Sequence, residues 1–338
     1  MPYALLKDLP PPPLGKTGYP WTEETLGSDQ INPAENHPRI SIITPSYNQG
    51  QFIEETIRSV LLQNYPNLEY IIVDGGSTDN TVEIIQKYET QLAYWVSERD
   101  RGQTHAITKG LRRSTGEIWS YLNSDDLLCP GSLEKVAESF RNPDVNWLGG
   151  VSEIFDETDL KGYVEPQRPL NRRDYLTPWQ REIQYVFPCS NVCFMRRHLL
   201  EQCGDFDESY DYGMDIEYYV RVVFQTGIEP QLIPDILGRW RWHPQSKTLK
   251  QGIAYGFRED EVRMALQYLQ CLDERDRQTI KREIQEQQKW LAVRKAGFYQ
   301  NQGKSELAWR ELTSQVGLSA ALSGFRPWYG TARRLLLA

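Results

Sequence analysis

The chain of 338 residues lacks the features that mark secreted, membrane-spanning and disulfide-bonded proteins. It has no uninterrupted apolar run of about 18 residues, the minimum for a spanning helix. No basic stretch followed by an apolar one opens the chain, and no Asn-x-Ser/Thr sequon occurs. The five cysteines are an odd number and form no Cys-x-x-Cys pair, so we expect reduced thiols and no zinc site. These absences together predict a cytoplasmic protein.

Positive charge is scarce over most of the chain. There are 38 Lys and Arg against 46 Asp and Glu, a net charge of −8. Nucleic-acid binding is not expected, because phosphate contacts need clustered basic side chains. The charge is also uneven: residues 281–338 hold ten basic and four acidic residues, a net of +6, which leaves −14 for residues 1–280. The sequence therefore predicts an acidic body and a basic tail.

The body alternates between strand and helix patterns. Short β-branched and apolar runs predict buried strands, and apolar residues at helical spacing lie between them. This order predicts right-handed βαβ crossovers and a mainly parallel sheet flanked by helices. Residues 1–38 are rich in proline and predict an N-terminal arm, with order beginning at Arg39. The predicted strands are Ile40–Thr44, Glu69–Asp74, Leu92–Val96 and Glu117–Leu122, and the predicted C-terminal helices are Asp260–Cys271, Glu274–Tyr299 and Ser305–Val316.

Polar residues follow three of the predicted strands. Ligands of open α/β sheets bind beyond the carboxyl ends of the strands. Asp125 and Asp126 end one strand, and two adjacent carboxylates repel each other unless a cation or hydrogen bonds compensate. A Mg²⁺ or Mn²⁺ ion bound with a diphosphate is one interpretation. An N-cap of the following segment is the other, because acidic pairs are common in turns.

Asp74 ends the second strand and is followed by a glycine pair that lets a ligand approach the backbone. It could accept hydrogen bonds from a base or ribose, or it could belong to a tight βα turn alone. No Gly-x-Gly-x-x-Gly fingerprint and no Walker lysine accompany it, which removes the main support for dinucleotide-dependent and NTPase chemistry. The sequence leaves both interpretations of Asp74 open.

Two further groups could contribute to chemistry. Asp215 opens a predicted helix, where the macrodipole favours an acidic N-cap and where a general base is the alternative. Arg239, Arg241 and His243 alternate, so on an extended segment they share one face. Three cationic donors on one face would suit a diphosphate leaving group.

In combination these residues resemble the family 2 inverting glycosyltransferases, which have the nucleotide-sugar-binding GT-A fold. The resemblance covers residues 39–250, which we expect to form the GT-A domain, with a helical extension over residues 251–338. One departure is His105 after Gly102-Gln103-Thr104, where relatives often have Asp. The matching stretches are Ile40–Thr81, Glu98–Leu133, Gly204–Val222 and, more weakly, Arg241–Thr248.

The resemblance implies a role for each matching position. It implies a divalent cation, Mn²⁺ or Mg²⁺, held by Asp126 with His243 nearby, and it makes Asp215 the catalytic base. The acceptor, a carbohydrate or a lipid-linked sugar, is expected near Cys189, Ser190 and Asn191. The expected donor is a UDP-sugar. The residues implied to contact the nucleotide-sugar are Pro45, Tyr47, Asn48, Asp74, Gly102, Gln103 and Asp125.

The resemblance implies a glycosyltransferase (EC 2.4) of polysaccharide or glycolipid biosynthesis. Two alternatives remain: a nucleotidyltransferase, which usually needs a Lys-bearing loop absent after the first strand, and a non-catalytic nucleotide-sugar-binding module. The basic tail ends in Trp328–Leu337, where arginines accompany aromatic and leucine side chains. We expect this tail to pack on the catalytic domain or on a second copy in a homodimer. Peripheral contact with an anionic membrane face is the alternative.

Overall fold

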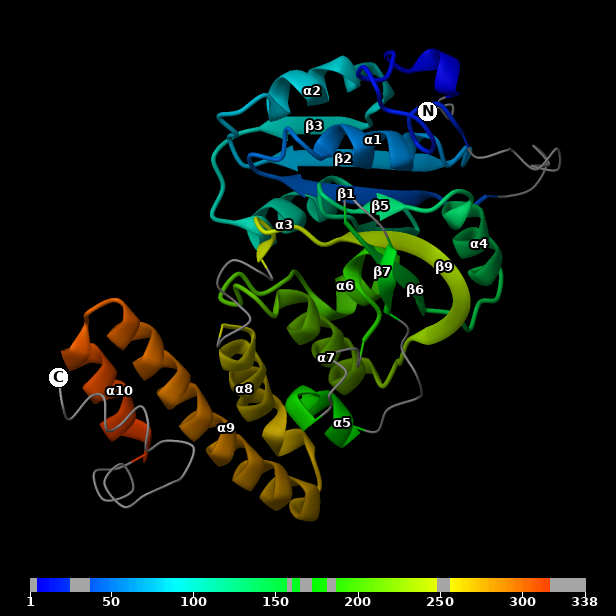
Figure 1. Ribbon diagram of the computed structural model, residues 1–338. Helices are drawn as coiled ribbons and strands as arrows, with labels where there is room; N and C mark the ends of the chain where they lie inside the picture. Colours follow the sequence, from blue (N-terminus) through cyan, green and yellow to red (C-terminus); the bar gives the residue numbers. More distant parts are fainter. Residues whose placement is uncertain are drawn as a thin grey trace. The chain divides into compact units, whose positions relative to one another are not determined.

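The computed structural model describes residues 5–24, 37–156, 160–164, 172–180, 187–247 and 256–316 (Figure 1). The chain divides into two compact units. The first unit comprises Met1–Pro169, Tyr185–Ser209 and Met214–His243. The second comprises Leu170–Gln184, Tyr210–Gly213 and Pro244–Ala338. These boundaries differ from the expected division at residues 38 and 250, because the N-terminal arm joins the first unit and two internal segments join the second.

A nine-stranded sheet, in the order β3-β2-β1-β4-β8-β6-β9-β5 with β7 on β6, forms the centre of the first unit. Its first four strands are parallel, as the βαβ pattern predicts. Helices follow the first three of these strands, so polar residues after the strands gather at one edge. The strands are β1 (Ile40–Ser46), β2 (Leu68–Asp74), β3 (Tyr94–Ser97) and β4 (Ile118–Tyr121); the helices are α1 (Ile53–Leu61), α2 (Thr81–Lys87) and α3 (Gln103–Arg113).

Every residue of β1, β2 and β4 is buried, whereas the edge strand β3 is half-buried. Side chains alternate across a strand, so both faces of the three buried strands are covered. On one face, Ile40, Ile42 and Ile72 join the core with α1 and α2. On the other face, Ile71 and Val73 of β2 pack with Ala106 of α3. α3 lies so close to β1 that a Cβ at position 110 would be 2.4 Å from Ile43, which explains the glycine there. Figure 1 shows α1 and α2 beside β2 and β3.

The other half of the sheet is mixed rather than parallel. β8 runs antiparallel to β4 and β6, β7 antiparallel to β6, and β5 antiparallel to β9; only β6 and β9 are parallel. Parallel pairing therefore covers β1 to β4 and the β6–β9 pair, and the remaining pairs are antiparallel. The elements are β5 (Leu127–Leu128), β6 (Trp147–Phe155), β7 (Leu160–Val164), β8 (Cys193–Arg196), β9 (Gln231–Arg241), α4 (Ser132–Ser139), α6 (Arg197–Cys203) and α7 (Met214–Thr226).

The proline-rich arm is packed structure, so order begins before Arg39. Leu9 and Trp21 are buried, and the fully buried guanidinium of Arg58 on α1 holds the arm. Arg58 donates to the carbonyls of Pro20 (2.9 Å), Trp21 (3.0 Å) and Pro10 (2.8 Å). The Trp21 ring also lies 5.3 Å from the guanidinium carbon. One cation therefore satisfies three carbonyls of a segment that has little regular structure of its own.

We expect Arg58→Met to lower the free energy of unfolding by about 3 kcal/mol, because three buried or half-buried carbonyls lose their donor. The measurement is urea denaturation followed by tryptophan fluorescence. Arg113→Met, an exposed arginine on α3, is the matched control and should change stability by less than about 1 kcal/mol. Equal denaturation midpoints for the two variants would show that Arg58 does not anchor the arm.

The second unit is helical. α9 has Asp273 at its N-cap, where the carboxylate accepts the Asp276 N–H, and α9 packs on α10 through Ala296, Ala308 and Leu312. No helix among the described residues has the length and apolar character needed to cross a bilayer. Trp328–Leu337 lies outside the described residues. The helices described in this unit are α5 (Arg172–Leu176), α8 (Phe257–Tyr268), α9 (Glu274–Asn301) and α10 (Ser305–Val316). Among the described residues of the whole chain, the 3₁₀ helices are Leu6–Asp8, Glu89–Gln91, Pro178–Gln180, Ser190–Val192 and Leu269–Cys271.

Candidate active site at the carboxyl ends of the strands

Asp74 organises the loop after β2. Its carboxylate is fully buried and accepts hydrogen bonds from the backbone N–H groups of Gly76 (3.1 Å) and Ser77 (2.9 Å). The hydroxyls of Ser77 (2.5 Å) and Ser97 (2.6 Å) complete its shell. Gly76 has φ +82°, a left-handed conformation that disfavours a side chain. Asp74 therefore belongs to a tight βα turn, as one of the two interpretations predicts. A hydrogen bond to a base or ribose would be an additional role of the same carboxylate.

The loop after β1 is held to the loop after β2. The backbone N–H of Asn48 donates to the Ser77 hydroxyl (2.7 Å), and the Asn48 side-chain oxygen accepts the Thr78 N–H (2.8 Å). Pro45 is buried, whereas the Tyr47 side chain is 57% exposed. The loops thus present an exposed aromatic ring beside a rigid, polar backbone, an arrangement suited to a planar base.

Asp125 and Asp126 lie in the turn between β4 and β5, and not at a helix. The N-cap interpretation is wrong, because the next element is a strand. Asp126 is only 2% exposed, and its Oδ1 accepts the backbone N–H of Arg241 at 3.0 Å. Its backbone carbonyl accepts the hydroxyl of Thr56 on α1 at 2.8 Å. Burial first, and the negative charge of Asp125 second, raise the pKa of Asp126 well above its usual range.

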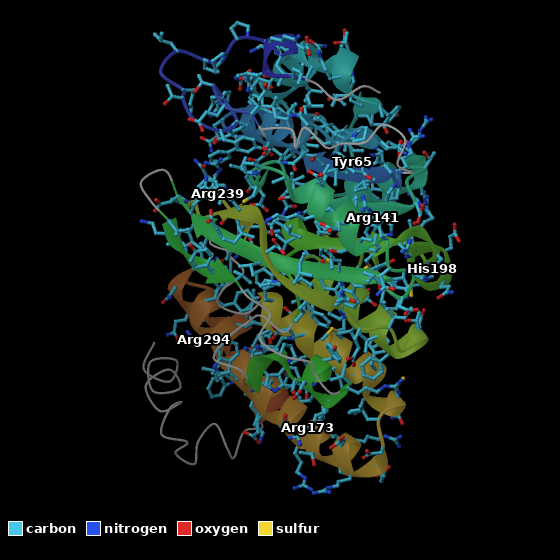
Figure 2. The ribbon with its side chains drawn as sticks, turned by 90° about the vertical axis from the view of Figure 1, so that its right-hand side faces the viewer. Tyr65, Arg141, Arg173, His198, Arg239 and Arg294 are labelled. Carbon is cyan, nitrogen blue, oxygen red and sulfur yellow. The ribbon has the colours of Figure 1, made fainter. Side chains whose placement is uncertain are left out.

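Arg239 and Arg241 of β9, and His243 just after it, have carboxylate partners within the protein. His243 Nε2 lies 2.9 Å from Asp125 Oδ2, and the His243 ring packs on Phe52 with centroids 4.4 Å apart. Each of the three side chains expected to face a diphosphate therefore already has a carboxylate partner within the protein. Arg241 is 6% exposed and bonds Glu55 (2.9 Å), and Arg239, labelled in Figure 2, pairs with Glu153 (3.0 Å).

A chain of amides links the start of α3 to Asp126. Gln103 donates to Asn123 Oδ1 at 2.7 Å, and Asn123 donates to Asp126 Oδ2 at 3.3 Å. Gly102 precedes α3 with φ +121°, and its N–H donates to Asp100 at 2.8 Å. The Gly-Gln pair therefore reaches the acidic turn through hydrogen bonds. His105, in the position of the expected Asp, accepts the Arg101 N–H through Nδ1 at 3.2 Å, a bond within its own loop.

Asp215 lies in the first turn of α7 and is partly exposed. It follows Met214, the first helical residue, and its carboxylate accepts the N–H of Ile216 at 2.9 Å. It is therefore inside the helix rather than at its N-cap. Met214 contacts Thr104 of α3 through its sulfur, which ties the start of α7 to the start of α3 within the first unit.

Asp126 and Asp215, distant in sequence, act on the same side chain. Burial raises the pKa of the Cys189 thiol, and the negative charges of Asp126 and Asp215 raise it further. Asp126 and Asp215 also raise the pKa of Tyr121, at the end of β4, which burial already raises. Cys189 itself is partly buried. The charges of Asp126 and Asp215 are therefore both felt at Cys189 and at Tyr121.

The three residues proposed for the acceptor differ in exposure. Cys189 and Ser190 are partly buried, and the Ser190 hydroxyl bonds Tyr121. Asn191 is 1% exposed and donates to the Ser152 hydroxyl at 2.9 Å. Asn191 therefore fixes β6 to the segment before β8, and Cys189 and Ser190 are the more accessible of the three. All five cysteines are free thiols, as expected.

Sequence comparison identifies the family. The model of glycosyl transferase family 2 matches residues 41–204. An uncharacterised glycosyltransferase of Mycobacterium tuberculosis is 30% identical over 190 residues, which are 54% of this chain and 68% of that protein. The chain belongs to glycosyltransferase family 2.

TuaG of Bacillus subtilis, whose name assigns it to teichuronic acid biosynthesis, is 42% identical over 144 residues, 41% of this chain and 57% of TuaG. A Nostoc glycosyltransferase is 29% identical over 174 residues, 50% of this chain and 54% of that protein. This family 2 chain therefore spans a little over half the length of these two relatives.

Solved structures confirm the GT-A fold. Residues 1–349 of TarS from S. aureus, in complex with UDP-GlcNAc, superpose with a TM-score of 0.56 at 17% identity, covering 88% of this chain and 79% of that one. The mannosyltransferase PcManGT from Pyrobaculum calidifontis, with GDP-Man and Mn²⁺, gives a TM-score of 0.51 at 20% identity, covering 89% and 86%. At such identities the likeness is one of fold.

Asp125, Asp126 and His243 of this family 2 chain could bind a divalent cation whose remaining ligands come from a bound diphosphate. Within the described ranges, no three His, Cys, Asp or Glu side chains are placed to hold a metal by themselves. Asp125 and Asp126 offer hard oxygen ligands, and the buried Nδ1 of His243 has no hydrogen-bond partner. Mg²⁺ and Mn²⁺ commonly take one or two carboxylates and complete their shells with phosphate oxygens and water. These residues therefore fit a cation that arrives with a diphosphate.

Asp100 was not singled out from the sequence. A Cβ at position 75 would lie 2.6 Å from the Asp100 carboxylate, so this half-buried group rests directly on the Gly75 backbone beside Asp74. Asp100 lies inside the stretch Glu98–Leu133 that carries the family resemblance. That stretch was the available signal, but the sequence does not show that Asp100 folds back onto β2.

Proposed function

We propose that the protein is an inverting glycosyltransferase that transfers a sugar from a nucleoside diphosphate to an acceptor hydroxyl. The observation that carries the proposal is the pair of carboxylates, Asp125 and Asp126, in the turn after β4, where the parallel strands end; Asp126 is buried and held by the Arg241 N–H, and Asp125 is paired with His243. Asp126 in the acidic turn and Asp215 in the first turn of α7 can each perform one of the two tasks that the transfer needs. These tasks are charge compensation at the leaving group and removal of a proton from the acceptor.

The donor binds at the carboxyl ends of β1, β2 and β4. Tyr47 and Pro45 border the base, and Asn48 supports them from the loop after β1. Asp74 directly precedes Gly75, and the Asp100 carboxylate rests on the Gly75 backbone, so both acidic groups lie where we place the base or ribose. Asp125 is the more exposed carboxylate of the acidic turn, 18% against 2% for Asp126, which suits a ribose contact.

The diphosphate lies against the acidic turn. Asp126 and, through its free ring nitrogen, His243 would hold the divalent cation together with the phosphate oxygens. Bound there, the cation supplies compensation of the negative charge that develops on the leaving nucleoside diphosphate. Gln103 and Asn123 orient the Asp126 carboxylate through their hydrogen bonds, and Gly102 lets the start of α3 approach.

Asp215 acts on the acceptor. Its carboxylate takes the proton of the attacking hydroxyl while the acceptor oxygen bonds to the anomeric carbon. The bond between that carbon and the diphosphate oxygen breaks, and its electron pair leaves with the diphosphate. Attack from the opposite face inverts the anomeric configuration. Cys189 and Ser190, next to Asp215 and Tyr121, are the proposed acceptor contacts.

The pathway is proposed from the relatives. TuaG is named for teichuronic acid biosynthesis, and the TarS structure contains UDP-GlcNAc. We therefore propose a UDP-sugar as donor, and a saccharide or lipid-linked saccharide as acceptor in polysaccharide biosynthesis.

Donor screening tests the function. Purified protein is incubated with UDP-, GDP- and dTDP-sugars, with and without Mn²⁺, and with soluble and lipid-linked acceptors, and the products are read by mass spectrometry. We expect cation-dependent release of the nucleoside diphosphate and a glycosylated acceptor. Release of pyrophosphate from an NTP would instead assign a nucleotidyltransferase, and nucleotide binding in thermal shift without any turnover would assign a non-catalytic module.

A further inference from the structure

Four residues join the proposed base to the helical unit. Asp215 and the rest of α7 belong to the first unit, whereas the segment directly before α7, Tyr210–Gly213, belongs to the second. Met214 and Asp215 are the first two residues of α7 and follow Gly213 without a spacer. Tyr210–Gly213 is therefore one attachment of the first turn of α7, and the contact of Met214 with Thr104 is another.

One carboxylate of α8 holds the backbone of this segment. Asp260 Oδ2 accepts the N–H of Tyr212 at 2.8 Å and the N–H of Gly213 at 3.0 Å. The side chain of Asp260 is 12% exposed, and its Oδ1 accepts from Arg263 at 3.1 Å. A Cβ at position 213 would lie 3.2 Å from the Asp260 Cβ, closer than ordinary contact. Gly213 thus allows the backbone to approach Asp260 and give it two charge-assisted bonds.

Aromatic side chains hold the same segment on α8. The Tyr210 ring, 1% exposed, lies 3.6 Å from the guanidinium carbon of Arg263, and its hydroxyl donates to Gln267 at 3.0 Å. The Tyr212 ring packs on Phe257 with centroids 5.3 Å apart. Backbone bonds and ring contacts thus fix both ends of a four-residue segment to one helix.

We propose that Asp260 is a positioning residue for the transfer reaction: through Tyr212 and Gly213 it sets the start of α7 and so the place of the Asp215 carboxylate. The inference rests on the proposed function of Asp215. Asp260 then acts on the reaction through the backbone of Tyr212 and Gly213, which leads directly into α7. Displacement of a catalytic group by about 1 Å can cost about 100-fold in rate, so two backbone bonds are enough to matter.

The test compares Asp260→Ala with Asp260→Asn in the full chain. Asp260→Ala removes both backbone bonds, and we expect kcat to fall about 10- to 100-fold while the dissociation constant for the donor stays unchanged. Asp260→Asn keeps one side-chain oxygen that can accept both N–H groups, so it should retain most of the wild-type kcat. Glu259→Ala, which removes an exposed neighbour on the same helix, is the matched control and should leave kcat unchanged.

Amide hydrogen exchange over residues 210–216 supplies a readout that needs no turnover. We expect faster exchange there in Asp260→Ala and wild-type exchange in Glu259→Ala. A wild-type kcat in Asp260→Ala, or a parallel loss of donor affinity that Asp260→Asn does not rescue, overturns the proposal. If the wild-type protein transfers no sugar, the proposed function fails, whereas unchanged exchange in Asp260→Ala overturns the attachment of the segment itself.

Discussion

Asp215→Asn is expected to lower the rate of sugar transfer by about 10²- to 10⁴-fold, the usual contribution of a general base. The amide cannot take the proton of the acceptor hydroxyl, but it has the same shape as the carboxylate. Its oxygen can still accept the Ile216 N–H, so the first turn of α7 should remain intact. Donor affinity should not change, because the proposed donor contacts come from β1, β2 and the acidic turn.

Two measurements check this expectation. Steady-state transfer with a saturating donor gives kcat, and isothermal titration with the nucleoside diphosphate and Mn²⁺ gives donor-site affinity. Asp235→Asn makes the same chemical change at a residue paired with Lys135, outside the proposed site, and should behave as wild type. Near-wild-type turnover in Asp215→Asn would remove Asp215 from the role of base.

Asp126→Asn is expected to move activity and stability in opposite directions. Transfer should fall about 10²- to 10³-fold, because the leaving diphosphate loses a ligand of its compensating cation. The protein without donor or cation should be at least as stable as wild type at pH 8. The reason is that burial and the charge of Asp125 disfavour the ionised Asp126 carboxylate, which raises its pKa.

The pH dependence gives the sign. The folded protein binds the Asp126 proton more tightly than the unfolded chain does, because the pKa of Asp126 is raised on folding. The contribution of this proton to the free energy of unfolding is full below the pKa of the unfolded chain. It declines as pH rises through the raised pKa of the folded protein. Asp126→Asn lacks that decline. Urea unfolding between pH 5 and pH 8, without divalent cations, should therefore give wild type the steeper loss of stability. Asp144→Asn, at an exposed position before β6, should follow wild type. Parallel pH profiles for wild type and Asp126→Asn would contradict the expectation.

The strand ends were predictable because two local signals coincide there. Buried strands are short apolar runs, and polar groups such as Asp74 and Asp126 follow them directly. Parallel strands connected by helices bring those ends to one edge, so the site could be placed without knowing any tertiary contact. The helices of the second unit were predictable for a similar reason, since their apolar spacing is local.

The partners of the site residues and the helix positions they occupy were not predictable from the sequence. Alternation placed Arg239 and Arg241 on one face, but it could not show that Glu153 and Glu55 pair with them, because both glutamates come from distant elements. An N-cap at Asp215 would start the helix at Ile216, whereas α7 begins two residues earlier, at Met214. The attachment of Gly213 to Asp260 leaves no periodic signal, because it joins a loop to a helix far along the chain.

Because Arg58 anchors the N-terminal arm, the start of the folding unit differs from the start of the region of sequence similarity. Similarity to family 2 begins at residue 41, but the folding unit begins earlier, because Leu9, Trp21 and the carbonyls that Arg58 binds lie upstream. A chain that began at residue 41 and kept its C-terminal part would hold a buried guanidinium in α1 without its acceptors and would uncover apolar surface. The cut protein would then be prone to aggregation even though every proposed substrate contact is retained. The boundary of sequence similarity marks the shared chemistry, and the cooperative folding unit extends beyond it.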